Sequence, residues 1–144
     1  PYAIGNHRHA PEIGQELSRA FGEDLLITFT PHLIPMNRGE LETIYVTLAD
    51  GQSAGDLRGI LKRHYQDETF VTIVGENTTP ATRDVRGSNN AHIGVFEDRI
   101  PGRAIIVVVI DNLVKGSSGQ AVQNMNLMFG FDESLSLEQM PLFP

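Results

Sequence analysis

The sequence predicts an α+β fold, a mixed and largely antiparallel sheet backed by helices. The chain has 144 residues, of which 40% are hydrophobic, and this size suits a single soluble core. Its apolar residues follow helical spacing in some stretches and alternation in others. The expected order of elements is helix, strand, strand, helix, strand, strand, strand, helix. That order lacks the regular strand–helix repeat of a parallel α/β sheet.

The first helix is expected over 11–21, because its apolar residues recur at i, i+4, i+7 and i+8. Pro11 suits a first helical turn, and Gly22 suits a helix end. Strands are expected at 25–30 and at 41–48, and the residues of the second stretch alternate along the strand.

A second helix should begin after Ser53, because an acidic residue, Asp56, follows it at the third helical position. A short strand is expected at 70–74. The polar stretch 76–90 is expected to be a loop, and its length suggests a functional role or an interface.

Strands are expected at 92–96 and 103–110, and the second of these is continuously apolar, which predicts burial on both faces. A glycine-rich turn at 111–119 leads into a last helix that ends at Gly130. We expect 1–110 to form one unit and 111–144 a turn, returning helix and tail. The apolar residues of this last part should be exposed and favour self-association; they are Phe129, Phe131, Leu135, Leu137 and Phe143.

Composition excludes several classes of function. The net charge is −7 and the basic residues are scattered, which argues against a nucleic-acid partner. No apolar run reaches the ~20 residues that span a bilayer, and no signal-peptide pattern is present, so we expect a cytoplasmic chain that does not enter membranes. Cysteine is absent, which excludes a cysteine nucleophile, disulfides and thiolate metal sites in this sequence.

Two stretches carry residues suited to chemistry on an acidic substrate. His7, Arg8 and His9 combine acid–base groups with a guanidinium, which can bind a carboxylate or phosphate through two hydrogen bonds. Arg38, before a glycine, could hold the same kind of group. Each also has a simpler explanation, as a solvated lead-in to a helix and as a surface arginine at a turn. A weak zinc interpretation of His7 and His9 with Glu12 has no complete ligand motif.

The turn at 111–119 follows an apolar strand and precedes a helix. Such a junction can present free backbone N–H groups and the positive end of a helix dipole to a phosphate or carbonyl. The alternative is a tight turn without a ligand, in which Gly116 and Gly119 serve backbone geometry only.

Four stretches resemble the N-acetyl-gamma-glutamyl-phosphate reductases of the semialdehyde dehydrogenase family. They are HRHAPEI at 7–13, FTPHLIPMNRG at 29–39, the pattern PxTxxVxGSNxxxIGV at 80–95, and DNLVKGSSGQAVQNMN at 111–126. The resemblance covers nearly the whole chain. It implies a fold like the C-terminal domain of glyceraldehyde-3-phosphate and semialdehyde dehydrogenases.

The resemblance also implies the site residues. His9 would be the acid–base residue, with His7 second, and Arg8 and Arg38 would bind the acidic small-molecule substrate. Cofactor contacts would come from Asn112, Lys115 and Gly116, with no metal involved.

The reaction implied is the NADPH-dependent reduction of N-acetyl-5-glutamyl phosphate to the semialdehyde, in arginine biosynthesis. The family's Gly-rich fingerprint and its nucleophilic cysteine belong to an N-terminal dinucleotide-binding domain, and neither feature occurs in this sequence. NADP(H) would therefore be bound mainly by that domain, and this chain alone should be inactive. The implied partners are that domain and further copies of the chain, as a dimer or tetramer.

Two other functions remain open from the residues. One is a dimerisation module without a catalytic role. The other is a metal-binding or hydrolytic protein that uses His7, His9 and His32 with carboxylates.

Overall fold

The computed structural model describes residues 1–142, and contacts divide the chain into two units, Pro1–Met36 and the part from Asn37 onward. Each unit is described by itself. The predicted division of the chain into 1–110 and 111–144 concerns the whole protein and stays a prediction.

The first unit contains one helix, α1, His9–Phe21. It starts two residues before the predicted position and ends as expected at Gly22, whose φ of 89° is left-handed. The expected strand at 25–30 is wrong: the segment pairs with no strand in the described residues. The Ser18 hydroxyl instead accepts the Leu25 N–H at 2.8 Å, so the chain turns back against the end of α1.

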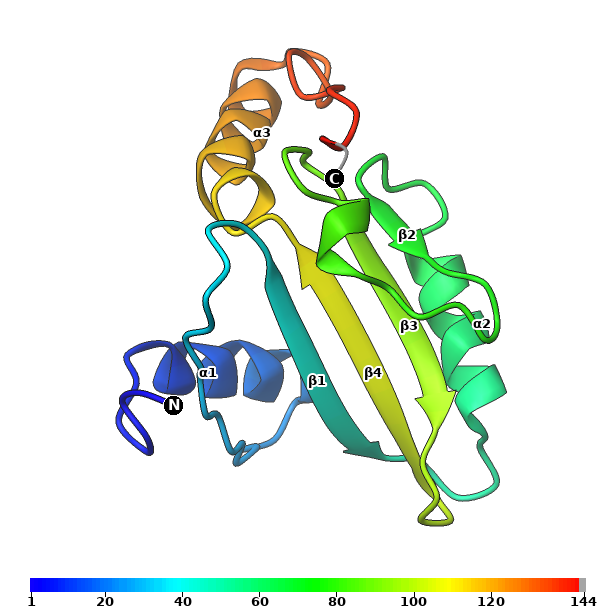
Figure 1. Ribbon diagram of the computed structural model, residues 1–144. Coiled ribbons are helices and arrows are strands. Elements are labelled where there is room, and N and C mark those ends of the chain that lie inside the picture. The colour runs from blue at the N-terminus through cyan, green and yellow to red at the C-terminus, as the bar shows by residue number, and fades with distance from the viewer. Residues whose placement is uncertain (143–144) are drawn as a thin grey trace. The chain divides into compact units, whose positions relative to one another are not determined.

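The second unit is built on a four-stranded sheet in the order β1-β4-β3-β2 (Figure 1). The strands are β1 Glu40–Thr47, β2 Val71–Ile73, β3 Ala91–Glu97 and β4 Arg103–Ile110. Strand β4 is antiparallel to both of its neighbours, and only β2 and β3 are parallel. This confirms the predicted mixed, largely antiparallel sheet.

Helix α2, Ala54–His64, packs on one face of this sheet and confirms the predicted N-cap. The Ser53 hydroxyl accepts the Asp56 N–H at 3.1 Å, and the Asp56 carboxylate accepts the Ser53 N–H at 2.9 Å. The apolar side of α2 covers a small core, whose members are Val46, Leu48, Ala54, Leu57, Leu61, Val95 and Ala104.

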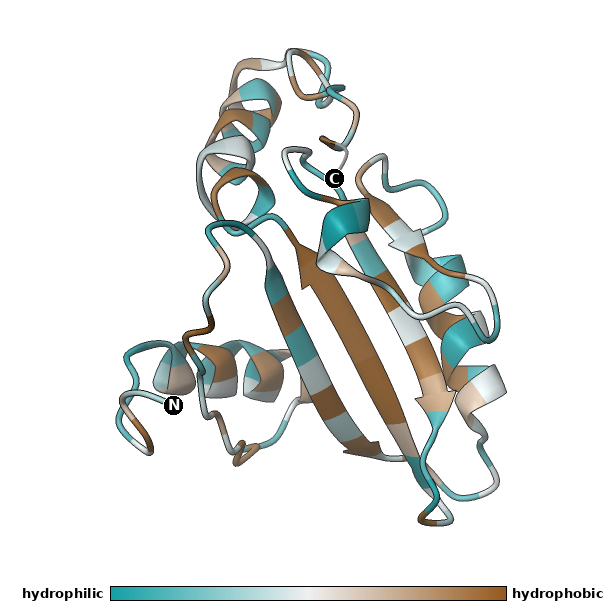
Figure 2. Cartoon of the chain, in the orientation of Figure 1, coloured by the Kyte–Doolittle hydropathy of each residue, from teal (hydrophilic) through white to brown (hydrophobic). Residues whose placement is uncertain are grey.

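Strand β4 is apolar from Ala104 to Ile110, after its charged first residue Arg103 (Figure 2). The expectation that it is almost fully buried is wrong, because only Ala104 and Val109 are buried and the other six residues are half-buried. The reason is that α2 contacts mainly β2 and β3 and leaves much of β1 and β4 open.

The loop expected at 76–90 is confirmed, with one short 3-10 turn at Thr82–Asp84. After β4 come a π-helical turn, Val114–Ser118, and helix α3, Gly119–Phe129, which ends at Gly130 as predicted. Of the apolar residues expected to be exposed there, Phe129, Phe131 and Leu135 are exposed, whereas Leu137 is buried. Phe143 lies outside the described residues.

Candidate functional site around Asp111

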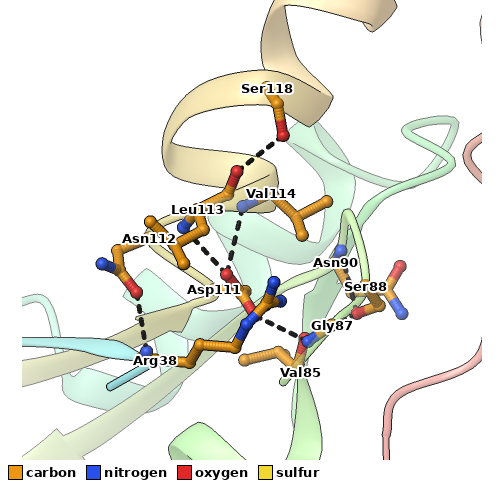
Figure 3. A network of polar contacts seen from close by, with 11 residues as sticks. Arg38, Val85, Gly87, Ser88, Asn90, Asp111, Asn112, Leu113, Val114 and Ser118 are labelled. Carbon is orange, nitrogen blue, oxygen red and sulfur yellow. Dashed lines mark hydrogen bonds and ion pairs between the residues drawn. The ribbon is translucent and has the colours of Figure 1, made fainter. Parts of the chain in front are cut away.

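A fully buried carboxylate, Asp111, lies where β4 ends (Figure 3). Its Oδ2 accepts a hydrogen bond from Arg38 Nη1 at 3.0 Å and one from the Gly87 N–H at 2.6 Å. Its Oδ1 accepts the N–H groups of Leu113 at 2.8 Å and Val114 at 3.1 Å. One side chain therefore holds together the start of β1, the 85–90 loop and the turn before α3.

Asp111 stays ionised despite its burial. Burial by itself raises the pKa of a carboxyl group, but the backbone N–H groups and Arg38 favour the charged form more strongly and lower the pKa of Asp111 below its ordinary value. The side chain of Arg38 is 37% exposed, while that of its partner Asp111 is fully buried. Part of the Arg38 side chain is therefore exposed to solvent, while the ion pair with Asp111 fixes the position of its charged group.

The glycine-rich turn differs from the expectation that it presents free N–H groups. The N–H groups of Leu113 and Val114 donate to the Asp111 side chain, and the Gly116 N–H donates to the Asp111 carbonyl at 3.0 Å. The Ser118 N–H donates to the Leu113 carbonyl at 3.2 Å. The carboxylate of Asp111 is therefore itself the anion at this helix start.

Asn112 and Lys115, both predicted to contact a cofactor, make contacts within the chain. Asn112 Oδ1 accepts the Gly39 N–H at 2.8 Å, which ties the beginning of β1 to the end of β4. Lys115 Nζ donates to Gln123 Oε1 at 2.7 Å and lies 5.5 Å from the centre of the Phe70 ring. Burial lowers the pKa of Lys115, and nearby glutamates oppose that shift.

A second buried network, which sequence reasoning missed, joins the 85–90 loop to α3. Asn89 Nδ2 donates to Gln123 Oε1 at 2.9 Å, and Gln123 Nε2 donates to Glu133 Oε1 at 2.5 Å. Asn89 and Gln123 are both buried. The GSN motif at 87–89, which contains Asn89, is the sequence signal that points to this network, whereas Gln123 carries no such signal.

Gly119 has no room for a side chain beside this network. A Cβ placed there would lie 2.3 Å from Asn89 Oδ1 and 2.9 Å from the Val114 carbonyl oxygen. Its φ of −66° is ordinary helical backbone, so close approach and not conformation requires the glycine.

The two predicted acid–base residues lie together in the first unit. The rings of His7 and His9 are 4.8 Å apart between centroids, and the His9 N–H donates to His7 Nδ1 at 3.3 Å. His7 also contacts the rings of Tyr2 and Phe29, each 5.3 Å away. His7 is half-buried, whereas His9 and Arg8 are exposed, so His9 is the more accessible imidazole of the pair.

The metal-binding alternative finds no support in the structure. Within residues 1–142, no three side chains from His, Cys, Asp and Glu gather closely enough to hold a metal ion. His32, the third histidine considered, is exposed, and its Nδ1 lies 3.2 Å from the Thr30 carbonyl. Over the same residues, no helix has the length and apolar character needed to cross a membrane.

The second unit is a helix-backed sheet with the buried Asp111 at the end of β4, and the histidine pair belongs to the first unit. Residues 1–112 match the family described as "Semialdehyde dehydrogenase, dimerisation domain". The chain therefore belongs to the semialdehyde dehydrogenase family.

Among curated relatives, the chain is 57% identical over 143 residues to N-acetyl-gamma-glutamyl-phosphate reductase of Rhodospirillum rubrum, covering 99% of this chain and 41% of that protein. It is 54% identical over 143 residues to a probable chloroplastic reductase of the same name from Arabidopsis thaliana, covering 99% of this chain and 36% of that protein. The chain thus spans about two fifths of the length of these relatives.

A solved structure with a similar fold is aspartate semialdehyde dehydrogenase II from Vibrio cholerae. The TM-score is 0.68 at 21% identity, and the match covers 88% of this chain and 38% of that one. This likeness confirms the predicted type of α+β fold.

Proposed function

We propose that the chain is part of an N-acetyl-gamma-glutamyl-phosphate reductase, which reduces N-acetyl-5-glutamyl phosphate to the semialdehyde with NADPH in arginine biosynthesis. The observation that carries the proposal is the likeness to the reductases above, 57% identity over 143 residues that cover 99% of this chain. The chain contains no cysteine, so the nucleophile would come from elsewhere in the whole protein. A cytoplasmic location is proposed with it.

In this proposal His9 moves the proton at the reacting oxygen, and His7 orients it. The hydrogen bond from the backbone N–H of His9 to His7 Nδ1 supports these two roles, because it occupies one ring nitrogen of His7, the less exposed histidine. Arg8, exposed beside them, would attract the acidic substrate.

Arg38 would bind the phosphate or carboxylate of the substrate. Its ion pair with Asp111 supports this role in a specific way: the carboxylate fixes one edge of the guanidinium, and the partial exposure of the side chain leaves it accessible. A planar guanidinium can hold two anions on different edges.

NADP(H) supplies a hydride to the reaction and would be bound mainly by a separate dinucleotide-binding domain. From this chain, the amide of Asn112 and the bare, exposed backbone at Gly116 fit an approaching cofactor ring. A cofactor contact from Lys115 requires its ammonium to leave Gln123. A π-helical turn at Val114–Ser118 supports a site here, because such turns often mark functional positions.

Two structural roles complete the proposal. The part of the chain before residue 111 would also form a homo-oligomer, as the dimerisation-domain match suggests. The segment 111–144 would pack on the dinucleotide-binding domain, and the exposed Met128, Phe129 and Phe131 of that segment support this role.

A complementation assay tests the proposal. The chain is mixed with a separately produced, cysteine-bearing dinucleotide-binding domain of the Rhodospirillum rubrum relative, and the phosphate-dependent reduction of NADP+ by N-acetylglutamate semialdehyde is followed. Activity should require both pieces. His9→Ala should then lower kcat by about 100- to 10,000-fold, the usual contribution of a general acid–base group.

His32→Ala is the matched control, because it removes an exposed imidazole from the same unit and should leave activity unchanged. A dimerisation module without a catalytic role remains the second candidate, favoured by the family description. Association of the two pieces with no activity, or equal activity of the His9 and His32 variants, would favour that candidate.

A further inference from the structure

Leu142, in the C-terminal tail, lies against the loop that binds Asp111. Its backbone N–H donates to the Arg86 carbonyl at 2.7 Å. Its side chain covers Gly87: a Cβ added to that glycine would lie 2.6 Å from Leu142 Cγ, and the three atoms nearest to it all belong to Leu142. The tail therefore contacts this loop through both its backbone and a side chain.

One peptide group joins Leu142 to Asp111. The carbonyl of Arg86 and the N–H of Gly87 belong to the same planar peptide, in which the two groups point in opposite directions. The carbonyl accepts from Leu142 at 2.7 Å, and the N–H donates to Asp111 Oδ2 at 2.6 Å. The tail and the carboxylate therefore bind opposite ends of one peptide group.

The orientation of this peptide depends on those two contacts. Gly87 has a φ of 77°, and a glycine backbone has more conformational freedom than that of any other residue. Val85 and Ser88 on either side are fully buried, so the loop is anchored around the peptide. The two hydrogen bonds also strengthen each other, because a carbonyl that accepts a hydrogen bond polarises the N–H of its own peptide.

The tail is held before it reaches this loop. Asn126 of α3, which is buried, donates to the carbonyls of Glu133 and Leu135 at 3.2 Å and 3.0 Å. From there the tail, red in Figure 1, runs back from the end of α3 toward the 85–90 loop. A tail anchored at its start restrains the peptide well, because less conformational entropy is lost when its far end binds.

The last contact in this series is the ion pair with Arg38. Asp111 Oδ2, the oxygen that accepts from Gly87, also accepts from Arg38 Nη1 at 3.0 Å. A shift of the carboxylate would therefore move the guanidinium. We propose that Leu142 is a positioning residue, which orients Arg38 toward an anionic group of the substrate through the 86–87 peptide and Asp111. The inference rests on the proposed substrate role of Arg38.

Substitutions in the tail test the inference. Leu142→Pro removes the N–H that donates to Arg86, and Leu142→Ala keeps that N–H but removes most of the side chain over Gly87. Met140→Ala is the matched control, because Met140 lies in the same tail and is 81% exposed. Circular dichroism checks that each variant is folded. NMR then measures the Gly87 amide signal and the pKa of the Asp111 carboxyl group.

In Leu142→Pro the Gly87 amide proton should move upfield and exchange faster with solvent, because its hydrogen bond is weaker. Burial raises the pKa of Asp111 and the Gly87 N–H is among the donors that lower it, so this pKa should rise toward its ordinary value. Leu142→Ala should cause smaller changes of the same sign, and Met140→Ala none. Unchanged Gly87 and Asp111 signals in Leu142→Pro, or equal changes in Met140→Ala, would overturn the inference.

The complementation assay gives a separate result for the proposed function. Arg38→Ala should raise the KM for phosphate or for the semialdehyde. Leu142→Pro should raise the same KM by about 10-fold, the effect of one weakened hydrogen bond to a charged group, with little change in kcat. An effect of Arg38→Ala without one of Leu142→Pro overturns the inference alone. No effect of Arg38→Ala on either KM overturns the proposed substrate role of Arg38, and the inference with it.

Discussion

The substitution Asp111→Asn should destabilise the second unit strongly, because it keeps the size of a buried side chain and removes its charge. Asp111 accepts four hydrogen bonds, two on each oxygen. An asparagine offers one oxygen and one NH2 group in the same space. Whichever way the amide is oriented, two donors would face an NH2 group that cannot accept from them.

The size of the effect follows from those contacts. Each hydrogen bond to a charged group contributes about 1.5–3 kcal/mol, so the loss of two costs roughly 3–6 kcal/mol. Removing one partner of a buried ion pair costs about 3–5 kcal/mol by itself. The exposed part of Arg38 regains water, which places the expected loss at about 3–5 kcal/mol, a large share of the ~5–15 kcal/mol typical of a domain.

Urea unfolding followed by circular dichroism measures this loss. The midpoint should move to lower urea with an unchanged slope, since the surface exposed on unfolding is the same. Glu76→Gln is the matched control: its carboxylate pairs with Arg58 at 3.3 Å but is 71% exposed, and such pairs contribute only about 0–1 kcal/mol. Equal losses in the two variants would refute the reasoning.

The stabilities of the parent chain and of Asp111→Asn should also depend differently on pH. The pKa of Asp111 is lower in the folded chain than in the unfolded chain, where an aspartate has a pKa of about 3.9. The stabilisation that the charged Asp111 contributes is therefore fully present above the pKa of the unfolded chain, and it is lost as the pH falls through the pKa of the folded chain. The stability gap between the parent and Asp111→Asn should narrow below about pH 4, and a gap that stays constant down to unfolding would contradict the assignment.

Two glycine substitutions should change the stability of the chain in opposite directions, and a substitution at Ser53 should change both the stability and the pKa of a neighbouring carboxyl group. Gly119→Ala should destabilise by about 1–3 kcal/mol in thermal or urea unfolding, because its Cβ would meet Asn89 Oδ1. Gly59→Ala, inside α2 with ordinary space around it, should instead stabilise by up to about 1 kcal/mol, so a shared sign would refute the packing argument. Ser53→Ala should cost about 1 kcal/mol, and by NMR titration the pKa of Asp56 should rise toward its ordinary value, because hydrogen bonds from Ser53 lower it; an unmoved pKa would exclude those bonds.

The sequence by itself predicts the elements whose signals are local. The capping box at Ser53 and Asp56, the helix end at Gly130 and the strand at 103–110 were all predictable, because each depends on neighbouring residues or on a continuous apolar run. The strand expected at 25–30 is wrong because a strand depends on residues far away in the sequence as well as on its own. A strand exists only where a partner completes its ladder, and an apolar run cannot show whether one does.

For the candidate site, local sequence was enough to single out the histidines, Arg38 and the glycine-rich turn, but not what each side chain contacts. Asp111 lies 73 residues from Arg38 along the chain, and nothing in either neighbourhood indicates their pairing. Tertiary structure brings the two together at the end of the sheet and directs the turn's N–H groups inward to the carboxylate. The types of residue at this site follow from the sequence, whereas their partners and charge states depend on burial, which only the folded chain creates.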